Sequence, residues 1–249
     1  MEKRLEGKVA FVTGSGGLIG PVIIRRLVEE GASVAVTDLS LETAEKIAAE
    51  VVRNGGKACA VALDVIDDAQ VAAAVAETEK KLGPIDILVN NAGFYRAPME
   101  SFYKTDEKIW RKMIEVNLGG TMCCCAKVLP RMVERKQGKI INIASIAGVS
   151  GLPGWAGYAA AKGGVILFSQ TLAMECGHFG ITVNCVSPGM IGGTPNENAG
   201  TWLGRGGTPA DVASMVAYLA SPEGDYITGV NYLVDGGRVV GPKNASWNR

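Results

Sequence analysis

Seven short runs of apolar residues, rich in valine, isoleucine and alanine, recur along the whole chain. They lie near residues 8–13, 33–37, 57–63, 86–90, 139–144, 181–187 and 230–234. Most of the segments between them, such as 41–54 and 67–82, carry apolar residues at helical spacing. Continuous apolar strands separated by helices are typical of a parallel sheet that is buried on both faces. We therefore expect an α/β fold with seven candidate strands in one domain over residues 1–249.

The composition limits the classes of function that fit. The 249 residues are 47% hydrophobic, which is enough for a sizeable core, and 25 Lys and Arg balance 25 Asp and Glu. Without a basic excess, nucleic acid is not expected as a partner. The N-terminus lacks the apolar stretch of a signal peptide, and no run approaches the roughly 18 apolar residues that cross a bilayer. We expect a soluble, cytoplasmic protein with no membrane partner.

The six cysteines and the single histidine, His178, do not form a metal-binding pattern. Three of the cysteines are consecutive at 123–125, and neighbours on a helix point about 100° apart, so they cannot converge on one ion. No C-x-x-C spacing occurs. The sequence indicates reduced thiols that pack as small core residues, and no metal site.

The segment TGSGGLIGP at 13–21 joins the first apolar run to a helix-like stretch. No G-x-G-x-x-G fits it, because Ile19 stands where the last glycine is required. Asp38 ends the second apolar run, and a carboxylate there can accept hydrogen bonds from an adenosine ribose while repelling a 2′-phosphate. Leu39 follows, with no Lys or Arg beside it. The combination favours a dinucleotide site, with NAD preferred over NADP, over the alternative of an unliganded glycine-rich turn.

Polar and small residues end further apolar runs. Asp64 closes the third, and Asn-Asn-Ala-Gly at 90–93 closes the fourth. Ligands of open α/β sheets bind at this carboxyl edge. The stretch 190–208 is rich in Gly, Asn and Thr and has no period, so we expect a mobile substrate loop near the bound ligand. Residues 241–249 are expected to form a C-terminal tail.

Tyr158 and Lys162 are four residues apart in a helix-like stretch, which places them on one face. A phenol has a pKa near 10, and an ammonium beside it, together with a positive nicotinamide ring, would favour the phenolate. Ser145 ends the apolar run before this stretch. Its hydroxyl could donate to a substrate oxygen while Tyr158 supplies or takes the proton.

Asn117 lies within a long helix-like segment, 106–135, beside Gly119 and Gly120. These residues are weak helix formers. A bend there could free a backbone carbonyl for a water molecule or for Lys162, and a simple helix break is the alternative.

Together these residues resemble the short-chain dehydrogenase/reductase family from Lys8 to about Gly237. The matching stretches are TGSGGLIG at 13–20, Asp64-Val65, NNAG at 90–93, Asn117, Ser145, Tyr158-x-x-x-Lys162, Pro188-Gly189 and Asp235-Gly236-Gly237. The resemblance implies a single Rossmann-like, doubly wound domain with a seven-stranded parallel sheet and helices on both faces. It also implies hydride exchange between a nicotinamide and an alcohol carbon.

The resemblance assigns a role to each candidate catalytic residue. Tyr158 is then the general acid/base, and Lys162 lowers its pKa and binds the nicotinamide ribose. Ser145 orients the substrate oxygen, and Asn117 supports a proton-relay water near the lysine. Family members are commonly dimers or tetramers, so a homodimer or homotetramer is expected.

The cofactor-binding residues expected on this basis lie mainly in the glycine loop, residues 13–21, and at or just after the ends of the apolar runs. They are Gly14, Ser15, Gly17, Leu18, Ile19, Asp38, Leu39, Asp64, Val65, Asn91, Ala92, Gly93, Tyr158, Lys162, Pro188, Gly189, Ile191 and Thr194.

Two positions depart from the family pattern. Leu18 stands at the middle glycine of T-G-x-x-x-G-x-G, and Gly193 stands at the threonine of P-G-x-I-x-T, with Thr194 one place late. Thr194 can still serve the nicotinamide if the preceding glycines adjust. We predict that the loop still cradles a pyrophosphate with the backbone amides of Ser15–Ile19.

The expected substrate pocket is mostly apolar and aromatic. Its candidate residues are Phe94, Tyr95, Arg96, Ser145, Trp155, Met190 and Trp202. Core packing is the alternative for each aromatic residue, and a surface position is the alternative for Arg96. The pattern favours a small or medium hydrophobic secondary alcohol, or its ketone, as substrate.

Three functions are therefore compared. The first is an NAD-dependent short-chain alcohol dehydrogenase or ketone reductase. The second is a 3-oxoacyl thioester reductase acting on an acyl carrier protein, which would prefer NADPH, and Asp38 disfavours it. The third is a catalytically idle dinucleotide-binding protein, which the intact Ser145, Tyr158 and Lys162 set disfavours.

Overall fold

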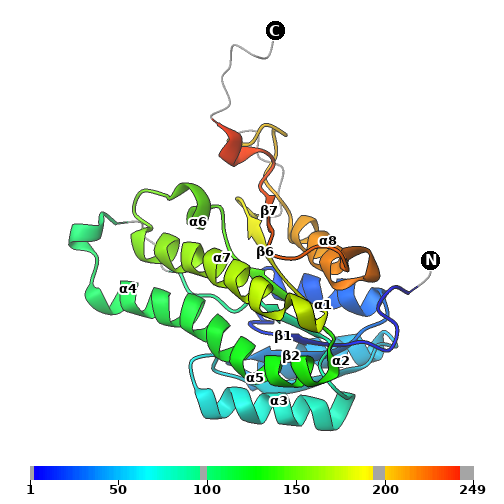
Figure 1. Ribbon diagram of the computed structural model, residues 1–249. Helices are drawn as coiled ribbons and strands as arrows, with labels where there is room; N and C mark the ends of the chain where they lie inside the picture. The colour runs from blue at the N-terminus through cyan, green and yellow to red at the C-terminus, as the bar shows by residue number, and fades with distance from the viewer. Residues whose placement is uncertain (1–2, 96–99, 193–199, 242–249) are drawn as a thin grey trace.

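The computed structural model describes residues 3–95, 100–192 and 200–241 and contains one seven-stranded parallel sheet (Figure 1). Its strands are β1 Val9–Val12, β2 Ser33–Asp38, β3 Ala58–Ala62, β4 Ile87–Asn90, β5 Gly138–Ile143, β6 Ile181–Pro188 and β7 Asn231–Val234. They are ordered β3-β2-β1-β4-β5-β6-β7, and every neighbouring pair is parallel. The predicted fold class is confirmed, and each predicted run coincides with a strand.

Eight α-helices are assigned in the described residues, and several of them begin at a side chain that caps them. Their bounds are α1 Gly20–Glu29, α2 Leu41–Arg53, α3 Asp68–Leu82, α4 Glu107–Ile114, α5 Gly120–Arg135, α6 Ala147–Ser150, α7 Ala156–Cys176 and α8 Pro209–Ala220. Ser40 and Asp67 accept hydrogen bonds from the first amides of α2 and α3, and Thr208 forms a capping box with Asp211 in α8. Among the described residues, no helix is long and apolar enough to span a membrane.

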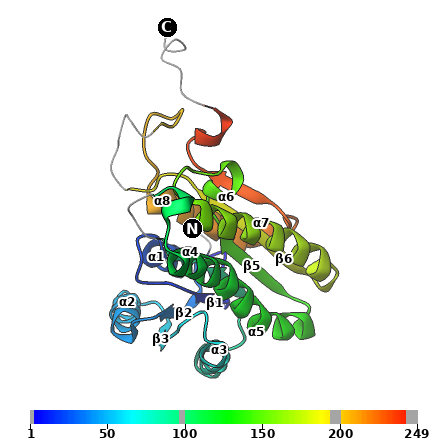
Figure 2. The same cartoon turned by 90° about the vertical axis from the view of Figure 1, so that its left-hand side faces the viewer.

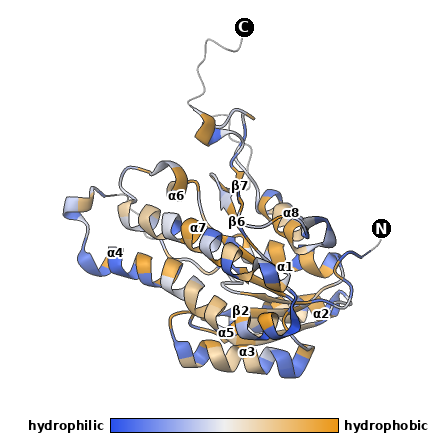
Figure 3. Cartoon of the chain, in the orientation of Figure 1, coloured by the Kyte–Doolittle hydropathy of each residue, from blue (hydrophilic) through white to orange (hydrophobic). Residues whose placement is uncertain are grey.

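The helices cover both faces of the sheet, as Figure 2 shows. One buried apolar cluster joins α1, α2 and α8 to the sheet, and a second joins α3, α5 and α7 to the opposite face. Figure 3 shows hydrophobic and hydrophilic residues on the same helices, as expected when one side of a helix packs on the sheet. The strand order reverses between β1 and β4, so a crevice opens at their carboxyl ends.

The long helical segment expected at 106–135 is interrupted at Asn117. A π-helical turn, Glu115–Gly119, separates α4 from α5. π-Helical turns occur mostly as single insertions in helices, frequently at functional sites. The buried Asn117 side chain lies in this turn and reaches back toward the loop after β4.

The two described ends of the expected substrate loop, 190–208, are paired. Ile191 forms a parallel bridge with Gly207, and the Gly207 amide donates to the Met190 carbonyl at 2.9 Å. Arg96 and Thr194 lie outside the described residues, as does the expected tail apart from Gly241.

Helices α6 and α7 approach closely at Gly148. A Cβ on Gly148 would lie 2.5 Å from the carbonyl carbon of Lys162 and 2.6 Å from the amide nitrogen of Gly163. Both are backbone atoms, which cannot relieve the overlap by a change of rotamer as a side chain could. The absence of a side chain at Gly148 therefore sets how closely Ser145, just before α6, approaches α7.

We predict that Gly148→Ala lowers the free energy of unfolding by about 1–3 kcal/mol, because the added methyl group forces α6 away from α7. Denaturant unfolding followed by circular dichroism measures this. The matched control is Gly177→Ala at the end of α7, where an added Cβ meets nothing within 4 Å and φ is −58°. Equal stability of the two variants would contradict the packing argument.

Candidate active site

A cavity of about 1100 Å³ opens at the carboxyl edge of the sheet, between the glycine loop on one side and α6 and α7 on the other. It brings together most of the predicted site residues. Those that line it are Gly14, Gly17, Leu18, Ile19, Asp38, Asn91, Gly93, Tyr95, Asn117, Ser145, Trp155, Tyr158, Lys162, Pro188, Gly189, Met190 and Ile191. Residues far apart in the sequence thus share one cleft.

Several predicted cofactor residues lie outside the cavity lining. The Ser15 hydroxyl is buried, donating to the Val12 carbonyl at 3.1 Å and accepting from the Thr37 amide at 3.2 Å, so it ties β1 to β2. Leu39 is 73% exposed beyond the end of β2. The remaining residues of this kind are Asp64, Val65 and Ala92.

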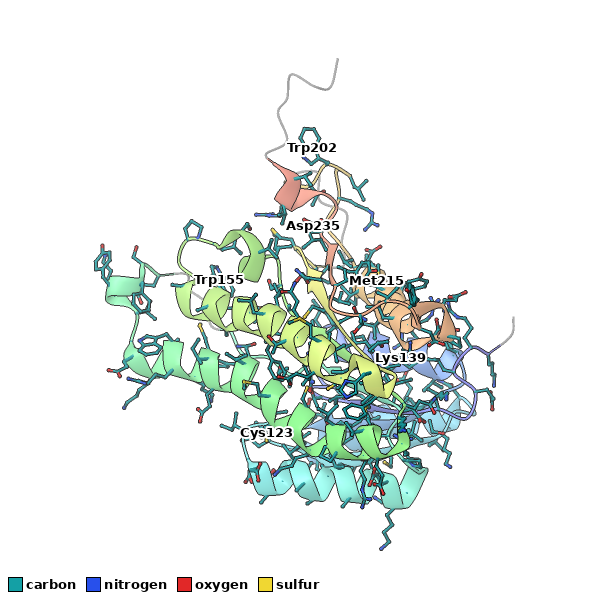
Figure 4. All side chains as sticks on the ribbon, viewed as in Figure 1. Cys123, Lys139, Trp155, Trp202, Met215 and Asp235 are labelled. Carbon is teal, nitrogen blue, oxygen red and sulfur yellow. The ribbon has the colours of Figure 1, made fainter. Side chains whose placement is uncertain are left out.

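Two predicted substrate residues also lie away from the lining. The Trp202 indole donates to the Gly241 carbonyl at 3.1 Å, so it is directed to the residue that follows the Arg238–Val240 turn. Figure 4 shows Trp202 well separated from Trp155, which stands at the start of α7. The Phe94 ring faces the Lys112 ammonium at 5.0 Å. For both residues a substrate contact stays a prediction.

The glycine loop is held from two sides. Gly14 has a φ of +62°, and a Cβ there would lie 2.6 Å from the Cα of Ala92. The Asn91 side-chain amide donates to the Gly14 carbonyl at 2.8 Å. On the other side, the Gly16 amide donates to the Asp38 carboxylate at 2.8 Å. The loop is therefore fixed against both β2 and the segment after β4.

The side chain of Leu18 is accommodated at the cavity wall, where it is 61% exposed. The Ser15 amide donates to the Thr37 carbonyl, and the Gly16 amide is engaged by Asp38. Of the amides predicted to hold a pyrophosphate, those of Gly17, Leu18 and Ile19 are the remaining candidates, just before α1.

Ser145 follows β5, while Tyr158 and Lys162 lie one turn apart on α7. The Ser145 hydroxyl accepts from the Ala147 amide at 3.1 Å. The buried Lys162 ammonium donates to the Ile143 carbonyl at 2.7 Å, and its nitrogen lies 5.7 Å from the centre of the Tyr158 ring. The sheet edge and α7 thus present a hydroxyl, a phenol and a cation to one cavity.

Burial controls the titration of both helical groups. It raises the pKa of Tyr158, while the hydrogen bond with Ser145 lowers that pKa and Tyr95 raises it further. Burial also lowers the pKa of Lys162 to about 8. In the chain by itself, Lys162 does not hold the pKa of Tyr158 below its usual value, since its ammonium is directed to the Ile143 carbonyl.

Asn117 supports the loop that carries Gly93 and Tyr95. Its side-chain amide donates to the Phe94 carbonyl at 2.7 Å, and its side-chain oxygen accepts from the Phe94 amide at 3.2 Å. The Asn117 backbone carbonyl accepts from the Thr121 hydroxyl at 2.9 Å. The contacts therefore indicate a positioning role; a water held by this carbonyl stays a prediction.

Aromatic rings form the wall around Tyr158. The Trp155 ring lies 5.4 Å from both the Tyr95 and Tyr158 rings, and the Tyr95 and Tyr158 rings are 6.3 Å apart. Such tilted and edge-to-face arrangements are favourable for aromatic pairs. They place an apolar surface next to the phenol.

Leu152 and Arg238 are among the lining residues that were not singled out from the sequence. Leu152 lies between α6 and α7, and Arg238 begins a short 3₁₀ turn, Arg238–Val240, after β7. The Asp-Gly-Gly motif directly before Arg238 is the signal that could have found it.

The six cysteines, all among the described residues, form no disulfide, and burial raises the pKa of Cys125 to about 12. Within residues 3–95, 100–192 and 200–241, no group of three or more His, Cys, Asp or Glu side chains is arranged to hold a metal ion.

Comparison with known proteins identifies the family to which the chain is similar. The model of short chain dehydrogenases matches residues 8–202. The chain is 37% identical to meso-2,3-butanediol dehydrogenase of Serratia marcescens over 244 residues, covering 94% of this chain and 95% of that protein. It is 39% identical to 3-oxoacyl-[acyl-carrier-protein] reductase of Synechocystis over 245 residues, covering 95% and 98%.

The fold comparison agrees with the sequence comparison. The crystal structure of gox2181 matches with a TM-score of 0.89 and 32% sequence identity, covering 96% of this chain and 98% of that one. The chain thus belongs to the short-chain dehydrogenase/reductase family, whose members are oxidoreductases that bind a nicotinamide dinucleotide.

Proposed function

We propose that the protein is an NAD-dependent oxidoreductase that interconverts a secondary alcohol and its ketone, with Tyr158 as general acid/base. The observation that carries the proposal is that Ser145, Tyr158 and Lys162 line the same cavity as Asp38 and the glycine loop. A catalytic set without a cofactor cleft, or a cleft without this set, would not support it.

The residues present fit a nicotinamide dinucleotide. Gly17, Leu18 and Ile19 precede the N-terminus of α1, a position that suits a pyrophosphate. Asp38 suits the adenosine ribose, and Pro188–Ile191 line the same cavity as Tyr158. When bound, the cofactor accepts a hydride from the alcohol carbon or donates one to the ketone.

The chain's own residues supply the proton chemistry. Ser145 holds the substrate oxygen by a hydrogen bond. During oxidation the unprotonated Tyr158 takes the hydroxyl proton, and during reduction the protonated Tyr158 returns it. Lys162 carries a positive charge below its pKa of about 8. Because its ammonium is directed to the Ile143 carbonyl, it would favour the phenolate only together with the positive ring of a bound nicotinamide.

Asp38 supports the preference for NAD over NADP. Its carboxylate accepts from the amides of Gly16 and Ser40, at 2.8 and 3.1 Å, and so stays at the end of β2. Among the described lining residues the cations are Lys162 and Arg238. Lys162 belongs to α7 and Arg238 follows β7, so neither belongs to the segment at the end of β2 that carries Asp38. A 2′-phosphate would meet a negative charge with no partner beside it.

The relatives' names give two candidate substrate classes. One names a small diol and the other an acyl-carrier-protein thioester. We favour a small or medium alcohol for this chain, because Asp38 disfavours NADPH and the wall beside Tyr158 is aromatic and apolar. Reduction of a 3-oxoacyl thioester is the second candidate, supported by the reductase relative.

We also propose a homodimer or homotetramer. Supporting side chains are the exposed apolar residues of α5 and α7, including Met122, Leu167 and Met174. An isolated chain would leave these residues in water.

Tyr158→Phe is expected to lower kcat for alcohol oxidation by about 10²–10⁴-fold, because phenylalanine cannot transfer the proton. NADH affinity, measured by fluorescence titration, is expected to stay unchanged. Tyr95→Phe is the control, since it removes a hydroxyl from the neighbouring ring and keeps the proposed base. Activity of Tyr158→Phe near that of wild type would refute the assignment.

The wild-type protein is expected to bind NADH at least about tenfold more tightly than NADPH, because Asp38 faces the added phosphate. Asp38→Ser should reduce this ratio by weakening NADH and strengthening NADPH. Fluorescence titrations with both cofactors measure the ratio. Tighter binding of NADPH by the wild-type protein would rule out the role given to Asp38.

Ser145→Ala is expected to move the rise of oxidation rate to higher pH. The Ser145 hydrogen bond lowers the pKa of Tyr158. Oxidation needs the unprotonated phenol, so without this hydrogen bond the active form of Tyr158 appears only at higher pH. The plateau of ketone reduction, which needs the protonated phenol, should extend to higher pH. Profiles of kcat/KM against pH in both directions, with exposed Ser150→Ala as control, test this; a shift to lower pH contradicts it.

A further inference from the structure

Three aromatic rings meet at the part of the cavity that holds the proposed acid/base. The Trp155 ring lies 5.4 Å from the Tyr158 ring, at an interplanar angle of 68°, and 5.4 Å from the Tyr95 ring. The Tyr95 ring lies 6.3 Å from that of Tyr158. All three residues line the cavity. A substrate oxygen that meets the Tyr158 hydroxyl therefore brings the rest of a small substrate to the region that the other two rings border.

The chain's own contacts leave part of this aromatic surface open. Tyr95 is 63% exposed although its ring contacts two others, and Trp155 is half-buried. A ring that served only to fill the core would be covered on both faces. Core packing, the alternative for these two aromatic residues, therefore does not account for their placement in the cavity wall.

The backbone beside both rings is fixed. Asn117 binds the peptide groups of Phe94 through two hydrogen bonds, at 2.7 and 3.2 Å, directly before Tyr95. Trp155 stands at the start of α7 (Figure 4), where its amide donates to the Leu152 carbonyl at 3.1 Å and its carbonyl accepts from the first turn of the helix at 2.8 Å. Binding a ligand between preformed contacts costs little ordering of the chain.

The side chains that accompany these rings are apolar. Between residues 152 and 158 the cavity is lined by Leu152, Pro153, Trp155 and Tyr158, none of which is charged. An aliphatic group placed there gains from the removal of apolar surface from water. An aromatic group gains this and, in addition, the attraction between ring edges and ring faces. The wall thus distinguishes a flat ring from a saturated one of similar size.

We infer that the substrate carries an aromatic ring near the reacting carbon, and that this ring packs against Tyr95 and Trp155. The substrate class is then an aryl-substituted secondary alcohol or the corresponding ketone. The inference rests on the proposed function. It assigns to Tyr95 and Trp155 a role in specificity, with no part in proton or hydride transfer.

The test compares the NADH-dependent reduction of phenylacetone and cyclohexylacetone by kcat/KM. In both ketones a methylene group separates the ring from the carbonyl, so the rings differ in aromatic character more than in size or in their effect on the carbonyl. The wild-type protein is expected to prefer phenylacetone by about fivefold or more, the size of an aromatic pair contribution. A purely hydrophobic wall would favour the saturated ring, which is the more apolar of the two.

Variants assign the preference to the rings. Trp155→Leu and Tyr95→Leu should each lower the ratio toward one, mainly through a higher KM for phenylacetone. Tyr95→Phe should keep the ratio, because it retains the ring. The matched control is Phe102→Leu, which removes an exposed aromatic residue that packs on Trp110 and does not line the cavity.

The outcomes separate this inference from the proposed function. A wild-type ratio at or below one, or turnover of aliphatic ketones alone, would overturn the aromatic site and leave the dehydrogenase intact. A ratio that both leucine variants leave unchanged would also overturn it. NADH binding without turnover of any ketone or secondary alcohol would overturn both proposals. The wild-type ratio tests the inference even if a leucine variant fails to fold.

Discussion

The parallel arrangement of the sheet is the constraint on which the site depends. Because all seven strands run the same way, their carboxyl ends meet at one edge, and the reversal of strand order between β1 and β4 opens a crevice there. Asp38 ends β2, while Asn91 and Ser145 follow β4 and β5, and the three residues reach the same cavity for this reason. The close approach of α6 to α7 then brings the segment after Ser145 against the helix of Tyr158 and Lys162.

Burial gives the site its chemical character. It raises the pKa of Tyr158 and lowers that of Lys162, so burial favours the neutral form of both groups. The Lys162 ammonium contacts the Ile143 carbonyl, which leaves its effect on the phenol indirect. Tyr158 therefore needs a further positive charge in the cleft before its phenolate is favoured near neutral pH. If Tyr158 is the acid/base that we propose, its proton transfer is thereby coupled to occupancy of the cleft.

Periodicity and spacing in the sequence predict the strands and the helix faces. The directions of loop side chains and the burial of single groups depend on contacts between distant segments, which the sequence does not show. Apolar runs locate all seven strands, and the four-residue spacing of Tyr158 and Lys162 predicts their shared helix face. Trp202 illustrates the limit, because loop residues have no period that fixes their direction, and its indole turns toward Gly241. The direction of the Tyr158 pKa shift also depends on burial, which one sequence does not reveal.

The central claim is that this cleft transfers a hydride directly between an alcohol carbon and a nicotinamide. The most direct measurement uses secondary alcohols, alkyl- and aryl-substituted, that carry deuterium on the alcohol carbon, with NAD in ordinary water. Mass spectrometry of the reduced cofactor is expected to find one deuterium per turnover, together with formation of the ketone. Reduced cofactor that carries only hydrogen from the solvent, or no reduced cofactor with any of these alcohols, would contradict the account.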